Sequence, residues 1–276
     1  LEVEFVPIER GSDAIPALLQ GDLDVINGTV SPAVLNTAAT SAEFKVVADR
    51  VSYLPQDCSY TSFVVRKDFL ESGALDDPNA KIRTAGSTAS ISEFLRELAF
   101  EHEGISLDRL ELLDVPTQAT LQALLDGGID MATLVEPELT RGLQTGEIVI
   151  WVQAEEIMAN YLFGTVAFGP NLLVENREAG QRFMVAYLKA VRQYNEGKTE
   201  RNLEIVANAT QLDVEFLQAA CWPAIRSDGL IDYSSVEAWQ QWAISKGYLE
   251  APLTEEQFWD PSFVEFANQV LGGTAP

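Results

Sequence analysis

The hydrophobic and polar positions of this chain follow the same order twice, about a hundred residues apart. Residues 17–25 read ALLQGDLDV, and residues 123–131 read ALLDGGIDM. In each copy, apolar residues at helical spacing stop at a glycine, and a short apolar run typical of a buried strand follows. A single repeat at this distance predicts two similar lobes, because a solenoid needs three or more short repeats. Two lobes enclose a cleft, where we expect a ligand to bind.

Capping signals around the first copy predict a strand between two helices. The first helix begins near Ser12 and stops at Gly21, and residues 23–26 form a buried parallel strand. Ser31 and Pro32 are then the N-cap and the first residue of the second helix.

The second copy repeats this order of elements. It predicts a helix over residues 117–126, a strand over residues 129–132, and a new helix that opens at Glu136 and Pro137. Strands that alternate with helices indicate an α/β fold with a mostly parallel sheet in each lobe.

Polar residues follow the predicted strand in both copies. Ligands of α/β sheets bind beyond the carboxyl ends of the strands, so these residues are candidates for the site. They are Asn27, Gly28, Thr29 and Ser31 in the first lobe and residues 133–136 in the second. The alternative is that residues 27–28 form only a tight turn and Ser31 only caps a helix.

A glycine-rich turn at residues 86–90 joins another predicted strand to a helix. Ser90 and Glu93 have the spacing of a capping box. Free backbone N–H groups and the hydroxyls of Ser87 and Thr88 at a helix N-terminus form a binding site for a small anionic or strongly polar group. No Lys-Ser or Lys-Thr pair follows the glycine, which excludes a nucleotide P-loop. The alternative is an ordinary cap.

The remaining pattern predicts a discontinuous first lobe. The polar stretch at residues 72–81 crosses into the second lobe, and the chain returns near an apolar strand at 161–168, which we expect to pair with residues 60–65. Lobe 1 is therefore predicted over residues 1–80 and 165–276, with a helical C-terminal tail, and lobe 2 over residues 81–164. The strand-like start at residues 1–6 suggests that a preceding segment is missing from this numbering.

Composition and charge exclude several classes of function. The chain has 42 acidic and 18 basic residues and a formal net charge of −24, which argues against nucleic acid as a partner. No apolar run approaches the length of a membrane span. The single histidine, His102, and the absence of a nucleophile-elbow motif make classical hydrolase chemistry unexpected. Cys58 and Cys221 are compatible with a disulfide or with two buried thiols, and no zinc-ligand spacing is present.

Taken together, these motifs resemble the solute-binding proteins of ABC importers in the nitrate, sulfonate, taurine and thiamine-precursor group. The resemblance rests on the order and spacing of five stretches, at residues 1–7, 17–25, 82–90, 123–137 and 160–195. It implies the type-2 periplasmic-binding fold, with two lobes, a mixed sheet flanked by helices in each, and a ligand cleft between them. Members of the family normally begin with one more strand and helix, which this sequence lacks.

The resemblance implies ligand contacts in both lobes. They map onto Asn27, Gly28 and Thr29 in lobe 1 and onto Ser87, Thr88 and Ala89 in lobe 2, with Ser31 and Tyr161 as further candidates. Glu136 either accepts hydrogen bonds from an amine-bearing ligand or only caps the helix at Pro137.

The function implied is that of a periplasmic or extracellular binding protein, lipid-anchored if the missing segment supplies an anchor. It captures a small sulfonate, carboxylate or pyrimidine-like solute by hinge closure and delivers it to an ABC importer permease, as a monomer without cofactor or metal. Two alternatives share the fold: the effector domain of a regulator, and an enzyme resembling thiamine-pyrimidine synthases. The enzymes rely on a cysteine-rich iron motif and histidines that this chain lacks.

Overall fold

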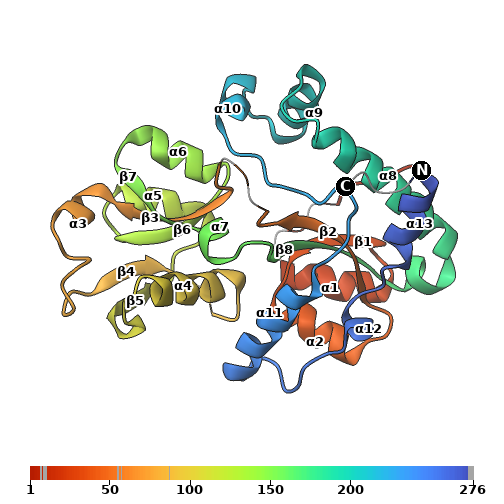
Figure 1. Ribbon diagram of the computed structural model, residues 1–276, viewed down its shortest axis with the longest axis horizontal. Helices are drawn as coiled ribbons and strands as arrows, with labels where there is room; N and C mark the ends of the chain where they lie inside the picture. The colour runs from red at the N-terminus through yellow and green to blue at the C-terminus, as the bar shows by residue number, and fades with distance from the viewer. Residues whose placement is uncertain (7, 9–10, 55, 57, 87, 273–276) are drawn as a thin grey trace. The chain divides into compact units, whose positions relative to one another are not determined.

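The computed structural model describes residues 1–6, 8, 11–54, 56, 58–86 and 88–272, without the side chains of residues 11 and 12. The chain divides into two compact units (Figure 1). Unit 1 consists of Leu1–Ser52, Asn160–Asn202 and Ala224–Pro276, and unit 2 of Tyr53–Ala159 and Leu203–Pro223.

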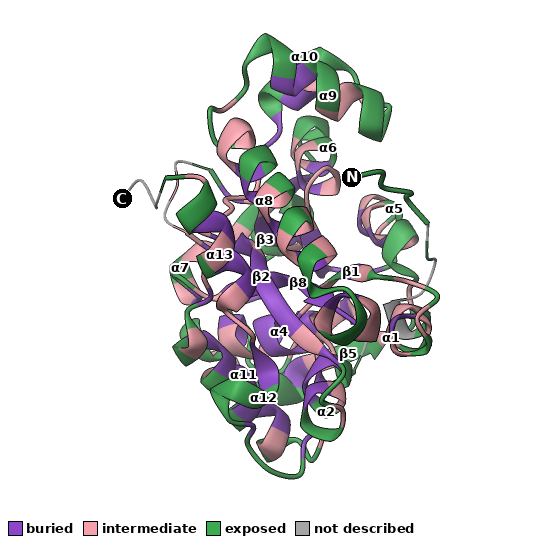
Figure 2. Ribbon diagram, turned by 90° about the vertical axis from the view of Figure 1, so that its right-hand side faces the viewer, coloured by how far each residue is buried: buried purple, intermediate pink, exposed green. Residues whose placement is uncertain are grey.

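Unit 1 is built on a three-stranded sheet in the order β1–β8–β2. Both β1 (Val25–Thr29) and β2 (Lys45–Ser52) run antiparallel to the central strand β8 (Leu162–Phe168). All seven residues of β8 are buried, and Figure 2 shows β2 and β8 largely in the colour of buried residues. The helices of this unit are α1 (Gly11–Gln20), α2 (Pro32–Thr40), the one-turn π-helix η3 (Asn171–Glu175), α8 (Arg177–Tyr194), α11 (Tyr233–Ser245), α12 (Glu255–Phe258) and α13 (Ser262–Val270), while α9 (Glu200–Thr210) spans the boundary.

Unit 2 contains a five-stranded mixed sheet in the order β5–β4–β6–β3–β7. Strand β4 (Ile82–Ala85) is parallel to both β5 (Leu110–Leu113) and β6 (Met131–Val135). Strand β3 (Thr61–Arg66) is antiparallel to β6 and to β7 (Ile148–Gln153). The helices are α3 (Lys67–Glu71), α4 (Ile91–His102), η1 (Leu107–Arg109), η2 (Thr117–Ala119), α5 (Thr120–Leu125), α6 (Glu138–Thr145), α7 (Ala154–Ile157) and α10 (Val214–Ala219).

Neighbouring residues of one strand supply two separate cores in unit 2. Val64 and Ala132 pack with Leu124 in one apolar cluster. Val65 and Met131 pack with other residues in a second cluster. Successive side chains of a strand point to opposite faces, so the sheet is covered by apolar side chains on both faces. This explains why every residue of β3 except Arg66 is buried.

The repeated motif builds the same junction in both units. Gly21 and Gly127 have φ values of 80° and 74°, a left-handed conformation that ends α1 and α5 as the glycine pattern predicted. The aspartate that follows each glycine is structural. Asp24 accepts a hydrogen bond from the Asn171 amide at 2.9 Å, and Asp130 accepts bonds from the backbone and side chain of Arg83 at 2.5–2.9 Å.

Strand pairing and the lobe boundary differ from the expectation. Residues 61–66 pair with β6 and β7, not with the strand at 162–168, and β1 is antiparallel to β8 and not part of a parallel sheet. Apolar character marks a buried strand but carries no information about its partner, because partners lie far apart in sequence. The first passage between units therefore falls after Ser52, and residues 53–80 and 203–223, expected in lobe 1, belong to unit 2.

Two further expectations are corrected in the same way. The stretch at residues 72–81 stays within unit 2, where the Arg109 guanidinium donates to the carbonyls of Ala74, Leu75 and Ala80. Residues 1–6 form no strand and are exposed, so their alternating pattern finds no partner strand in the described chain.

Candidate functional site

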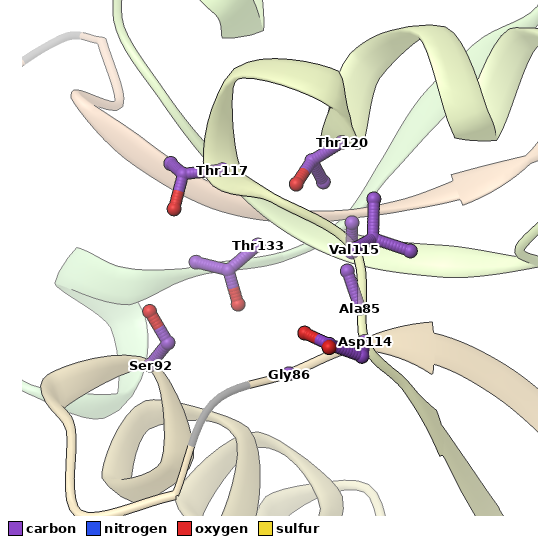
Figure 3. Close-up of a pocket in the computed structure, with 9 residues that line it drawn as sticks. Ala85, Gly86, Ser92, Asp114, Val115, Thr117, Thr120 and Thr133 are labelled. Atoms are coloured by element: carbon purple, nitrogen blue, oxygen red, sulfur yellow. The ribbon is translucent and has the colours of Figure 1, made fainter.

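A cavity of about 160 Å³ opens in unit 2 beyond the carboxyl ends of its parallel strands. It lies where β4 ends at Ala85 and β5 ends at Leu113, with β6 beside them (Figure 3). Its lining residues are Ala85, Gly86, Ser92, Asp114, Val115, Thr117, Thr120, Ala132 and Thr133.

The topology of the sheet creates this opening. From β4 the chain passes through α4 to β5 on one side of β4, and from β5 it passes through α5 to β6 on the other side. Connections that leave to opposite sides separate at the strand ends, and such switch points are where α/β sheets bind ligands.

The wall of the cavity is mainly hydroxyl-bearing and carries one charged side chain. In Figure 3 the side-chain oxygens of Ser92, Thr117 and Thr133 border the same space as the carboxylate of Asp114. Thr120 is fixed by its hydroxyl, which donates to the Pro116 carbonyl at 3.3 Å. A hydroxyl both donates and accepts hydrogen bonds, so this wall suits a small polar ligand.

The turn from β4 to α4 borders the cavity, but several of its polar groups are already used. Ser90 caps α4 by accepting from the Glu93 N–H at 3.3 Å. Glu93 in turn accepts from the Ala89 N–H at 2.7 Å, where the expected capping box would place its partner at residue 90. Thr88 and Ala89 are exposed in this turn and do not line the cavity, and Ser87 lies outside the described residues.

Arg96 packs behind the cavity wall, on the α4 side of Gly86. A Cβ atom at Gly86 would lie 2.9 Å from Arg96 Nη1 and 3.0 Å from a methyl of Leu112, so a larger residue there requires the ends of these side chains to shift. Burial lowers the pKa of the Arg96 guanidinium, while Glu93 and Glu97 raise it. The positive charge of Arg96 is thus offset by the carboxylates of its own helix.

The Glu136 carboxylate is engaged in holding local structure. It accepts from the Thr140 N–H at 3.1 Å and hydroxyl at 2.8 Å, at the start of α6, and from the Cys221 N–H at 2.9 Å. Cys221 is joined to Cys58 by a disulfide, the first of the two states that the sequence left open. Glu136 and the disulfide together fix residues 203–223 to the rest of unit 2.

The candidates in unit 1 lie on or beside its sheet. Asn27, Gly28 and Thr29 belong to β1 and pair with residues 164–166 of β8, so they extend the strand and do not form a turn. Ser31 is the N-cap of α2 and accepts from the Val34 N–H at 3.4 Å. Tyr161 directly precedes β8. Of the candidates in unit 2, Thr133 lines the cavity, and Thr88 and Ala89 lie in the bordering turn.

Ser92, Asp114, Thr117 and Thr120 are site residues that the sequence analysis missed. Ser92 belongs to α4, and the signal for the other three was the short strand β5, whose end brings Asp114 and Val115 to the cavity. The pattern LELLDVP at residues 110–116 is short and mixed in polarity, and half of β5 is exposed at the sheet edge, so its periodicity is weak.

Comparison with known proteins identifies the fold. No protein-family model matches this sequence, and no curated protein matches it. Among solved structures, the ligand-binding component of an ABC-type import system from Staphylococcus aureus with zinc bound superposes with a TM-score of 0.78 at 16% identity, covering 95% of this chain and 87% of that chain. The chain has the fold of ABC-importer solute-binding proteins. The expected fold class and the resemblance are thereby confirmed.

Two other structures with this binding-protein fold show its range. A putative periplasmic sulfonate-binding protein SsuA from Methylobacillus flagellatus has a TM-score of 0.71 at 18% identity, covering 98% of this chain and 83% of that chain. A DSZB variant in complex with biphenyl-2-sulfinic acid has a TM-score of 0.67 at 14% identity, covering 94% of this chain and 89% of that chain. DSZB is an enzyme, so the fold by itself does not separate binding from catalysis.

Within the described part of the chain, no three or more His, Cys, Asp or Glu side chains are grouped to hold a metal ion. No described helix is both long and apolar enough to cross a membrane.

Proposed function

We propose that this chain is an extracytoplasmic solute-binding protein that delivers a small polar organic solute to the permease of an ABC importer. The observation that carries the proposal is the hydroxyl-lined cavity at the switch point of the unit 2 sheet, in a chain with the binding-protein fold. The ligand class proposed is a small sulfonate, carboxylate or nitrogen heterocycle. In unit 1 we propose Asn27, Gly28, Thr29, Ser31 and Tyr161 as further ligand contacts, with capture by hinge closure.

The disulfide supports a location outside the cytoplasm. Disulfides persist in oxidising compartments and are rare in the reducing cytosol. The Cys58–Cys221 bond closes a separation of 163 residues and is part of how unit 2 is assembled. A folded state that depends on this bond is expected only where the thiols are oxidised.

Binding without chemical change is favoured by the side chains of the cavity. Among the described residues, its lining has four hydroxyls and one carboxylate and contains no histidine, lysine or cysteine. A hydroxyl needs an adjacent general base to act as a nucleophile, and the one carboxylate of the lining, Asp114, is hydrogen-bonded to none of these hydroxyls. We therefore propose that the ligand is held and released unaltered.

A thermal-shift screen on the purified chain tests the proposal. Taurine, alkanesulfonates, nitrate, short carboxylates and aminopyrimidines are added one at a time, and a ligand that binds only the folded state raises the midpoint. Isothermal titration then gives the affinity, and chromatography of the recovered ligand shows whether it is unchanged. If none of these compounds raises the thermal midpoint, the binding proposal is contradicted. Recovery of a chemically converted product would favour an enzyme.

A further inference from the structure

We propose that Asp114 makes the site selective for solutes that carry a protonated amine. The inference rests on the proposed function and names the ligand class of the same cavity. Asp114 is the only charged residue among the nine that line it. In Figure 3 its carboxylate borders the space enclosed by the hydroxyls of Ser92 and Thr133.

The Asp114 carboxylate is available for a ligand. It makes no hydrogen bond or ion pair with any other residue of the described chain, and the residue is exposed. The two acidic side chains that flank β6 are occupied. Asp130 is bonded to Arg83 and lies 4.0 Å from Arg66, and Glu136 is bonded to Thr140 and Cys221.

The chemistry of the wall gives this carboxylate the deciding role. An ionised carboxylate only accepts hydrogen bonds, so its partner on the ligand must donate. An ammonium group forms a charge-assisted bond there, whereas a sulfonate or carboxylate oxygen is repelled. The four hydroxyls of the lining adapt to either sign of partner and do not discriminate.

The Arg96 guanidinium beside Gly86 does not reverse this preference. Arg96 is not among the lining residues, and the negative charges of Glu93 and Glu97 on its own helix act on its guanidinium. A bare oxyanion therefore finds no uncompensated cation in this wall. The turn at residues 86–90, which the sequence suggested as an anion site, instead has the Ala89 N–H bonded to Glu93.

Two ligand pairs test the inference by isothermal titration on the full chain. Taurine and isethionate share a sulfonate and differ in an ammonium against a hydroxyl, and β-alanine and 3-hydroxypropionate make the same comparison for a carboxylate. In each pair for which binding is detected, we expect the ammonium member to bind at least about ten-fold more tightly than the hydroxyl member. One charge-assisted hydrogen bond accounts for a difference of this size. In Asp114→Asn we expect this preference to fall about ten-fold while the hydroxyl member binds as well or better.

Asp108→Asn is the matched control. Asp108 is also an exposed aspartate beside β5, but it precedes the strand, whereas Asp114 follows it. It removes the same charge from unit 2 and should leave the preference unchanged. Equal affinities within each pair, or a preference that survives in Asp114→Asn, would overturn the inference and leave the binding function standing. Equal loss of preference in both variants would assign it to overall charge and also overturn it. No binding of any of the four probes would count against the inference and the proposed function together.

Discussion

The Glu136 carboxylate accepts a hydrogen bond from the backbone N–H of Cys221 at 2.9 Å, across 85 positions of sequence. The same carboxylate receives the N–H and the hydroxyl of Thr140 at the start of α6. One side chain therefore joins a helix start to the half-cystine that anchors α10 to unit 2. The sequence allowed Glu136 to contact a ligand or to cap the helix after it, and these bonds are those of a helix cap.

Glu136→Ala should destabilise unit 2 by about 1–3 kcal/mol. Cys221 is buried, so removal of the Glu136 carboxylate leaves its backbone N–H without an acceptor. Urea unfolding monitored by fluorescence measures the change, and Glu136→Gln should lose less because its amide oxygen still accepts. A ligand-contact role would show the reverse pattern, with Glu136→Gln stable to urea but unable to bind ligand.

Removal of the disulfide should cost about 2–5 kcal/mol, the usual range for native disulfides that close long loops. The bond joins Cys58 to Cys221 across 163 positions. We expect a reductant to lower the thermal midpoint of the wild-type chain and to leave that of the Cys58→Ser, Cys221→Ser double variant unmoved. Equal midpoints for the oxidised wild type and the double variant would show that the bond adds no stability.

Asp49 should give the chain a stability that falls as the pH rises from about 4 to about 6. Asp49 is fully buried, and burial raises the pKa of its carboxyl to about 6, although hydrogen bonds from Arg226 N–H and Ser52 lower it. Between the unfolded pKa near 3.9 and the folded value, the unfolded chain has lost this proton and the folded chain keeps it, so ionisation favours unfolding. The contribution is complete below about pH 4 and is lost once the pH exceeds about 6.

The comparison variant for this effect is Asp49→Asn, which keeps the shape and does not titrate. Its oxygen can accept from the Arg226 N–H, and its amide can donate to the Ser52 hydroxyl. The free energy of unfolding of the variant minus that of the wild type should rise by about 2 kcal/mol from pH 4 to pH 6.5, at about 1.4 kcal/mol for each pKa unit. A difference that stays flat over this range would show that Asp49 is ionised throughout.

Thr133→Trp should reduce ligand binding by at least about a hundred-fold without unfolding the chain. Thr133 is a half-buried residue of β6 whose side chain lines the cavity, so an indole there fills the space that a ligand needs. Isothermal titration with the best ligand of the thermal-shift screen measures the loss. Ile150→Trp, at an exposed position of β7 in the same sheet, should bind normally. Normal binding by Thr133→Trp would remove this cavity from the site.

The sequence by itself determined the local elements of this protein and its fold class. Glycine stops at Gly21 and Gly127 and the Ser31 cap before Pro32 form as the pattern predicted. These features depend on contacts within a few residues, which periodicity and capping chemistry describe directly.

Only the tertiary structure decided which strands pair and which polar groups remain available to a ligand. Strand β3 is as apolar as a partner of β8 would be, yet it pairs with β6 and β7, because pairing depends on contacts between distant segments. Glu136 and Asp114 are both acidic residues after a strand, but the first is bonded to Cys221 and the second is unoccupied in the cavity wall. A carboxylate's role follows from the donors that the fold brings to it, and those donors are far away in the sequence.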